Sequence, residues 1–138
     1  MDLGLKGKIV VITGGSQGIG KAAALEFSKE GALCCVCARR EERLREAKKE
    51  FEEKGFSLFT MPVDVTKHEE LQAFADAVVK EYGRIDVWIN NAGANHFQNC
   101  LDYTVDEFRR MLDINLTAMF DGSCIAARYM KRPGAASS

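Results

Sequence analysis

The fold is decided by the stretch Val10–Phe27, VVITGGSQGIGKAAALEF, which places a glycine-rich turn between an apolar run and an amphipathic segment. The run Lys8–Thr13 is apolar and β-branched on both faces, which predicts a strand covered on both sides. From about Ile19 to Gly31, apolar side chains recur at helical spacing, and the closing glycine is a typical helix stop. A strand, a glycine turn and a helix in this order predict a phosphate-binding unit, and two kinds of unit fit these residues.

The first kind is the P-loop of nucleoside triphosphate-binding proteins, to which Gly15, Gly20 and Lys21 fit as G-x-x-x-x-G-K. A P-loop needs a Ser or Thr directly after the Lys, because that hydroxyl binds Mg²⁺, and Ala22 stands there instead. Asp64 ends a strand-like run and leaves a candidate for the second carboxylate that such sites use. The pattern disfavours a P-loop but leaves it open as an alternative.

The second kind is a dinucleotide-binding loop, to which Gly14, Gly18 and Gly20 fit as T-G-x-x-x-G-x-G. Glycines at a strand-to-helix turn let phosphate oxygens approach the backbone N–H groups closely. The spacing differs from the common G-x-G-x-x-G, so a purely structural turn is the alternative. We expect a dinucleotide here, held by six residues of the loop: Gly14, Ser16, Gln17, Gly18, Ile19 and Gly20.

The remaining chain alternates short apolar runs with amphipathic segments. We expect further strands at Leu33–Ala38, within 56–65 and at Ile85–Asn90, and helices at 41–55, 71–82 and from Phe108 towards Arg128. Such an alternation predicts an α/β fold, a Rossmann-like doubly wound parallel sheet of four strands in the order 3-2-1-4 with helices on both faces. Residues 1–131 form one dinucleotide-binding domain in this reading, and residues 132–138 a disordered tail.

Composition excludes several other functions. Lys and Arg number 19 against 20 Asp and Glu, which offers no attraction to nucleic acid or to an anionic membrane. No apolar run approaches the roughly 20 residues of a membrane span, and the first residues lack a signal peptide's apolar core. The five cysteines form no C-x-x-C motif, so we expect reduced thiols in a cytoplasmic protein with no metal, although Cys35 and Cys37 could form a pair.

The end of the second strand bears on the choice of dinucleotide. An acid at this place, about 20 residues past the glycines, holds the ribose hydroxyl of NAD, whereas an Arg accommodates the 2′-phosphate of NADP. The chain has Arg39 and Arg40 there, and its first acid is Glu41. The two arginines could merely begin a solvated helix, but an Arg suits bidentate phosphate binding. We predict NADP(H) over NAD(H), with Arg39 and Arg40 in the site.

Together these motifs resemble the short-chain dehydrogenase/reductase family over about residues 6–131. Thr13–Gly20 matches the family's cofactor loop, and Asp64-Val65 matches the pair after its third strand, whose Asp accepts a hydrogen bond from the adenine amino group. Asn90-Asn91-Ala92-Gly93 matches its N-N-A-G segment, so the resemblance implies that Asn91, Ala92 and Gly93 border the cofactor. The segment MLDINLTAMF resembles the helix that carries a catalytic Asn, which maps to Asn115.

The resemblance implies an NAD(P)-dependent oxidoreductase that transfers hydride between NADP(H) and a carbonyl or alcohol, and that forms homodimers or tetramers. Family members use a Tyr as general acid/base, with a Lys four residues later lowering its pKa. The residue four positions after Tyr82 is an acid, and so is the one four positions after Tyr103. The residue four positions after Tyr129 is a proline. We expect a cofactor-binding half that is inactive alone and whose oligomerisation is in doubt. The alternative is a binding module, or a truncation product, that never turns over.

Overall fold

The computed structural model describes residues 4–92, 102 and 104–131. The predicted cofactor residue Gly93 and the predicted tail 132–138 lie outside this part of the chain. Helices and strands alternate in the order β1 (Ile9–Thr13), α1 (Gly18–Lys29), β2 (Leu33–Ala38), α2 (Glu41–Glu53), β3 (Leu58–Pro62), α3 (His68–Tyr82), β4 (Val87–Asn90), α4 (Val105–Leu112), a π-helical turn (Asp113–Thr117) and α5 (Ala118–Met130).

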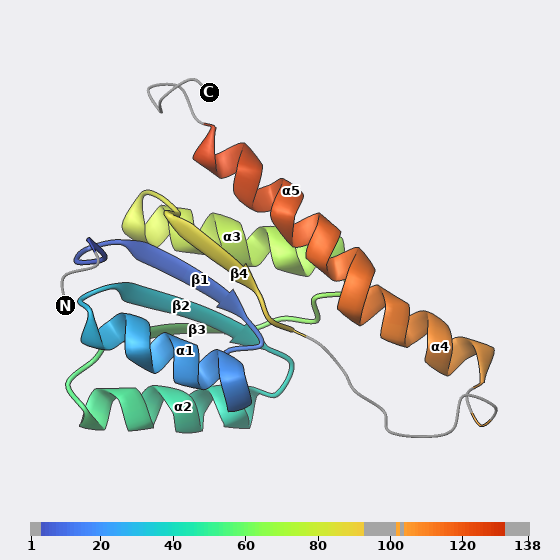
Figure 1. The fold of residues 1–138 in the computed structure, drawn as a ribbon, viewed down its shortest axis with the longest axis horizontal. Helices are drawn as coiled ribbons and strands as arrows, with labels where there is room; N and C mark the ends of the chain where they lie inside the picture. Colours follow the sequence, from blue (N-terminus) through green and yellow to red (C-terminus); the bar gives the residue numbers. More distant parts are fainter. Residues whose placement is uncertain (1–3, 93–101, 103, 132–138) are drawn as a thin grey trace.

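The four strands form one parallel sheet in the order β3-β2-β1-β4, which confirms the predicted fold class (Figure 1). All five residues of the central strand β1 are buried, as the apolar character of both its faces predicts. In register, Val11 lies between Cys35 of β2 and Trp88 of β4. The carboxyl ends of the strands therefore meet at one edge of the sheet.

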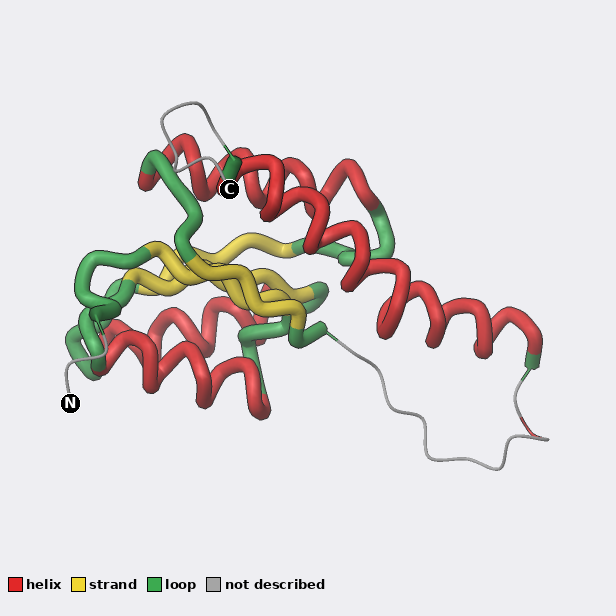
Figure 2. Tube along the Cα trace, turned by 45° about the horizontal axis from the view of Figure 1, so that its top comes forward, coloured by secondary structure: helices red, strands yellow, loops and turns green. Residues whose placement is uncertain are grey.

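Helices cover both faces of the sheet, so the molecule has three layers (Figure 2). On one face Val10 and Ile12 of β1 share a core with Leu44 and Phe51 of α2, and with α1. The core on the opposite face joins alternate residues of β1 and β2 to α3 and α5, with Phe74 as its largest buried ring. Alternation along β1 thus divides its side chains between two cores.

The chain from Val105 to Met130 forms one continuous rod, because a π-helical turn joins α4 to α5 (Figure 2). The α5 part packs against α3 and β4, where Gly122 lets the helix approach closely, since a Cβ there would lie 2.5 Å from the Asn90 side-chain oxygen. The α4 part extends beyond the carboxyl ends of the strands (Figure 1). No helix in the described part of the chain is long and apolar enough to cross a bilayer.

Strand β4 lies at the edge of the sheet, as the predicted strand order requires, and its residues are half-buried. The indole of Trp88 contacts the ring of Phe74 at 6.5 Å between centroids and donates its N–H to the Asn90 side chain at 2.9 Å. Asn90 in turn donates to the Ser123 hydroxyl of α5 at 3.0 Å. Helix α5 therefore shields one side of the edge strand.

Candidate functional site

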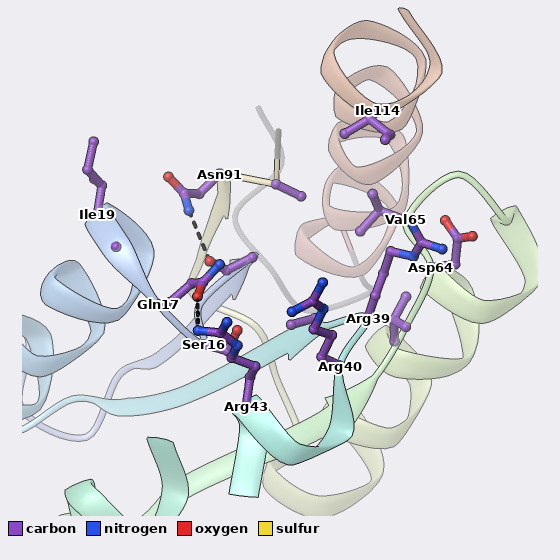
Figure 3. Close-up of a pocket in the computed structure, with 15 residues that line it drawn as sticks. Ser16, Gln17, Ile19, Arg39, Arg40, Arg43, Asp64, Val65, Asn91 and Ile114 are labelled. Carbon is purple, nitrogen blue, oxygen red and sulfur yellow. Dashed lines mark hydrogen bonds between the residues drawn. The ribbon is translucent and has the colours of Figure 1, made fainter. Parts of the chain in front are cut away.

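A cavity of about 580 Å³ lies at the carboxyl ends of the strands (Figure 3). In doubly wound sheets this is the side of the sheet on which ligands bind. The residues that line it come from the glycine loop and the start of α1, from the ends of β2, β3 and β4, from the first turn of α2, and from the π-helical turn: Gly14, Ser16, Gln17, Gly18, Ile19, Ala38, Arg39, Arg40, Arg43, Val63, Asp64, Val65, Asn91, Ala92 and Ile114. Most of the predicted cofactor residues are thus brought together.

The glycine loop presents bare backbone to this cavity. Gly14 and Gly18 have φ of +69° and +62°, a left-handed conformation that side chains rarely adopt. At Gly18 no atom lies within 4 Å of where a Cβ would stand, so the loop is open on that side. Helix α1 begins here, and the side chain of its N-cap residue Gln17 accepts no helix amide. The first amides of α1 are therefore available to an anion.

Gly20 lies behind the loop rather than in the cavity wall. A Cβ on Gly20 would stand 2.4 Å from the Gly14 carbonyl oxygen and 2.5 Å from the Asn91 side-chain nitrogen. Gly15 is similarly confined, because its Cβ would stand 2.4 Å from Val36. Gly20, which the sequence placed among the cofactor residues, lets α1 pack against the loop instead of lining the cavity.

Hydrogen bonds tie the end of β4 to the end of β1. The backbone amides of Asn91 and Ala92 both donate to the buried Thr13 hydroxyl, at 3.0 and 3.1 Å. The side-chain amide of Asn91 donates to the Gly14 carbonyl at 3.1 Å. These bonds hold the glycine loop in position, so part of the N-N-A-G segment acts on the loop as well as lining the cavity.

Asp64 is the only carboxylate in the described cavity wall. Its Oδ1 accepts hydrogen bonds from the amide and hydroxyl of Thr66, at 3.0 and 2.6 Å, and its Oδ2 lies 3.8 Å from the Arg110 guanidinium. Burial would raise the pKa of Asp64, but the Thr66 bonds and the charges of Arg110 and Arg39 outweigh it and hold the pKa below its usual value. The carboxylate is charged at neutral pH and can accept hydrogen bonds.

Three arginines enter the same cavity from the β2–α2 junction (Figure 3). Arg39 and Arg40 were predicted from the sequence, and Arg43 was not. Arg43 stands in the first turn of α2, and its Nη1 donates to the Gln17 side-chain oxygen at 2.6 Å. Its position four residues after Arg39 was the available signal, but the contact with the glycine loop requires the fold.

Asn115 lies in the π-helical turn with an exposed side chain and is not among the cavity-lining residues. Its neighbour Ile114, which the sequence did not indicate, lines the cavity. Single π-helical turns occur frequently at functional sites. The predicted catalytic residue therefore directly follows a cavity-lining residue in the chain, and does not itself line the cavity.

The P-loop alternative fails on the position of Lys21. Its ammonium group lies 2.6 Å from Glu50 of α2, and the residue does not line the cavity. Metal binding has no support in the described residues either, where no cluster of three His, Cys, Asp or Glu forms. Burial raises the pKa of Cys35 and of Cys37 to about 12, so both are protonated thiols and poor metal ligands.

Comparison with known proteins points to one family. A family model described as short chain dehydrogenase matches residues 8–137. The chain is 39% identical to 3beta-hydroxysteroid dehydrogenase 1 of Eggerthella lenta over 119 residues, which cover 86% of this chain and 46% of that protein.

Two solved structures are also similar to the chain. The L-sorbose reductase of Gluconobacter frateurii, complexed with NADPH and L-sorbose, superposes with a TM-score of 0.87 at 33% identity, covering 94% of this chain and 50% of that one. An NAD⁺-bound xylitol dehydrogenase gives a TM-score of 0.85 at 35% identity, covering 91% and 49%. The chain spans about half the length of these relatives.

Proposed function

Because the chain belongs to the short-chain dehydrogenase/reductase family, we propose that it is the NADP(H)-binding half of an oxidoreductase acting on CH–OH groups. One observation carries this proposal: a bare glycine loop at the start of α1 opens onto the same cavity as Arg39 and Arg40. A helix start favours a pyrophosphate, and arginines favour a further phosphate. The cavity volume, about 580 Å³, is within the range of sites for small molecules and cofactors.

The residues fit such a ligand from one end to the other. The backbone of the glycine loop, which is open at Gly18, would hold the pyrophosphate, and the charged Asp64 carboxylate would accept a hydrogen bond from the adenine amino group beside Val65 and Ala92. A bound nicotinamide dinucleotide supplies hydride, and the chain's part is to bind and orient it. Gly93 and Asn115, which the family pattern assigns to cofactor and catalysis, stay in the proposal on the resemblance alone.

The preference for NADP(H) rests on the arginines. An Arg presents its N–H donors in a fork that matches phosphate oxygens, whereas NAD(H) carries a neutral hydroxyl at that position. The relatives do not decide between the two, since one similar structure holds NADPH and another holds NAD⁺. We therefore assign the preference to the pair Arg39 and Arg40.

We further propose that these 138 residues bind the dinucleotide without turning over a substrate. None of the three tyrosines is followed by a Lys four residues later, so the chain has no Tyr whose pKa is lowered in that way. Reduction of a carbonyl, or oxidation of an alcohol, belongs in this view to a complete relative. Four free thiols among the described residues support a reducing compartment such as the cytoplasm.

Calorimetric titration of the chain with NADPH and with NADH tests the proposal. We expect both to bind and NADPH to bind more tightly. Arg39→Asp replaces a charge that attracts the 2′-phosphate by one that repels it. The affinity for NADPH should therefore fall about 10- to 100-fold, and the affinity for NADH should stay within a few-fold of the parent value. Arg45→Asp is the matched control, because Arg45 pairs with Glu41 at 3.7 Å and does not line the cavity.

The outcomes separate the parts of the proposal. A chain that binds neither dinucleotide has no cofactor-binding function. Tighter binding of NADH than of NADPH would overturn the assignment of Arg39 and Arg40, while leaving dinucleotide binding intact. Measurable oxidation of NADPH in the presence of a carbonyl compound would contradict binding without turnover.

A further inference from the structure

Arg43 and Gln17 join two walls of the cavity (Figure 3). Gln17 precedes α1 at the end of the glycine loop, and Arg43 stands in the first turn of α2. The Nη1 of Arg43 donates to the Oε1 of Gln17 at 2.6 Å, and both residues line the cavity. A cation is thereby held beside the loop proposed to bind pyrophosphate, although neither the glycine pattern nor the end of β2 marks this position.

The charge of Arg43 is not neutralised by its partner. The Gln17 side chain is a neutral amide, and none of the ion pairs among the described residues involves Arg43. Arg39 differs in this respect, because its charge acts on the Asp64 carboxylate. The nearby acid of the first turn, Glu41, pairs with Arg45 instead. Arg43 therefore brings a full positive charge to the cavity.

The remaining hydrogen-bonding capacity of Arg43 suits an anion. A guanidinium has five N–H donors, and the bond to Gln17 uses one nitrogen. A phosphate monoester carries about −1.5 to −2 charges at pH 7 and accepts charge-assisted bonds from such a fork. The amide of Gln17 fixes the direction of the guanidinium without competing for its charge.

We propose that Arg43 is a specificity-determining residue that contacts the 2′-phosphate of NADP(H) from α2, and that Gln17 positions it. This inference rests on the proposed NADP(H)-binding function and adds a determinant that the β2 end does not contain. NAD(H) has a hydroxyl where NADP(H) has the phosphate, so it gains little from this cation. Arg43 therefore acts on the choice between the two dinucleotides rather than on binding in general.

Calorimetry on the 138-residue chain tests the inference with Arg43→Gln, which removes the charge and keeps a polar side chain. We expect the Kd of NADPH to rise about tenfold, the loss of one charge-assisted contact, and that of NADH to change less than about twofold. The Kd of adenosine 2′,5′-bisphosphate should rise by the same factor as that of NADPH. The Kd of adenosine 5′-monophosphate, which has no 2′-phosphate, should stay unchanged. Arg43→Lys keeps the charge without the fork and should recover part of the loss.

Two controls accompany these variants. Arg45→Gln removes the same charge from the same helix outside the cavity wall and should leave both dinucleotides unchanged. Gln17→Ala removes the positioning amide but keeps the charge of Arg43. It should therefore lower the affinity for NADPH less than Arg43→Gln does. Thermal unfolding of each variant checks that the exposed substitutions leave the fold intact.

The failure of this inference is distinct from that of the proposed function. If the parent chain prefers NADPH and Arg43→Gln binds it equally well, the role of Arg43 is wrong and NADP(H) binding stands. Equal weakening of NADPH and NADH in Arg43→Gln would show that Arg43 only holds the glycine loop, which also overturns the inference. A parent chain that binds neither dinucleotide rejects the proposed function itself.

Discussion

The side chain of Asn91 is hydrogen-bonded to the backbone of Gly14: its Nδ2 donates to the Gly14 carbonyl at 3.1 Å and links the end of β4 to the end of β1. The same nitrogen fills the space beside Gly20, where a Cβ would stand 2.5 Å from it. One amide thus packs behind the glycine loop, where β4, the loop and α1 meet. The loop is held from behind, and its other side is left bare towards the cavity.

Gly14→Ala should destabilise the chain and weaken dinucleotide binding. Gly14 has φ of +69°, and a Cβ there would lie 2.9 Å from the Ala92 Cα, so the substitution combines backbone strain with a clash against backbone. We expect the free energy of unfolding in urea to fall by at least about 2 kcal/mol.

Gly55→Ala is the matched control for Gly14→Ala. Gly55 also has positive φ, +84°, but no atom lies within 4 Å of its Cβ position, so only the strain applies. This variant should lose about 1 kcal/mol and keep its affinity for NADPH. Equal destabilisation of the two variants would mean that the clash with Ala92 contributes nothing.

The fold could be predicted from the sequence because each element is locally consistent. Leu33–Ala38 is apolar throughout and forms β2 with those bounds, and Pro62 ends β3 as expected of a residue without a backbone N–H. Parallel strands joined by helices leave few ways to order four strands. The predicted order 3-2-1-4 was therefore within reach of pattern alone.

The candidate site was only partly predictable, because spacing does not tell which atoms face a cavity. Gly18 and Gly20 belong to one motif, yet Gly18 opens onto the cavity and Gly20 packs against Gly14. Arg43 was missed because its partner Gln17 lies 26 residues earlier in the sequence and meets it only in the folded chain. The Asn115 segment was predicted as a helix, and its π-helical geometry has no sequence pattern comparable to an apolar stripe.

Asp64 should make stability depend on acid pH. Its pKa is held below the ordinary value of 3.8, so the folded chain favours the charged carboxylate. The sign follows from linkage: the contribution is fully present above pH 3.8 and is lost as the pH falls through the lower pKa of the folded state. Asp64→Asn should therefore be less stable than the parent at pH 7, and the difference should shrink below pH 3.8.

Urea unfolding at a series of pH values measures this difference. Glu46→Gln, at an exposed position of α2 outside the cavity, controls for the loss of a negative charge. A difference between Asp64→Asn and the parent that stays constant from pH 7 to below 3.8 would show that the charge of Asp64 contributes nothing to stability.

The thiols of β2 should resist alkylation in the folded chain. Burial raises the pKa of Cys35 and Cys37 to about 12, and the thiolate is the form that reacts. Iodoacetamide at pH 8 should leave both unmodified until urea unfolds the chain, as followed by peptide mass spectrometry. Modification of either residue without loss of structure would contradict the buried placement of β2.

Large apolar side chains on the rod formed by α4 and α5 are exposed. Phe108, Leu116 and Phe120 are 48%, 57% and 70% exposed. Exposed large apolar side chains on one helical rod promote association when they gather into a patch. We expect the chain to self-associate with rising concentration in sedimentation velocity. Phe120→Glu should shift it towards monomer, because a carboxylate opposes burial. Ala127→Glu adds the same charge at an exposed position without removing a large apolar group, and should change little. A parent chain that stays monomeric at every concentration would rule out association through this rod.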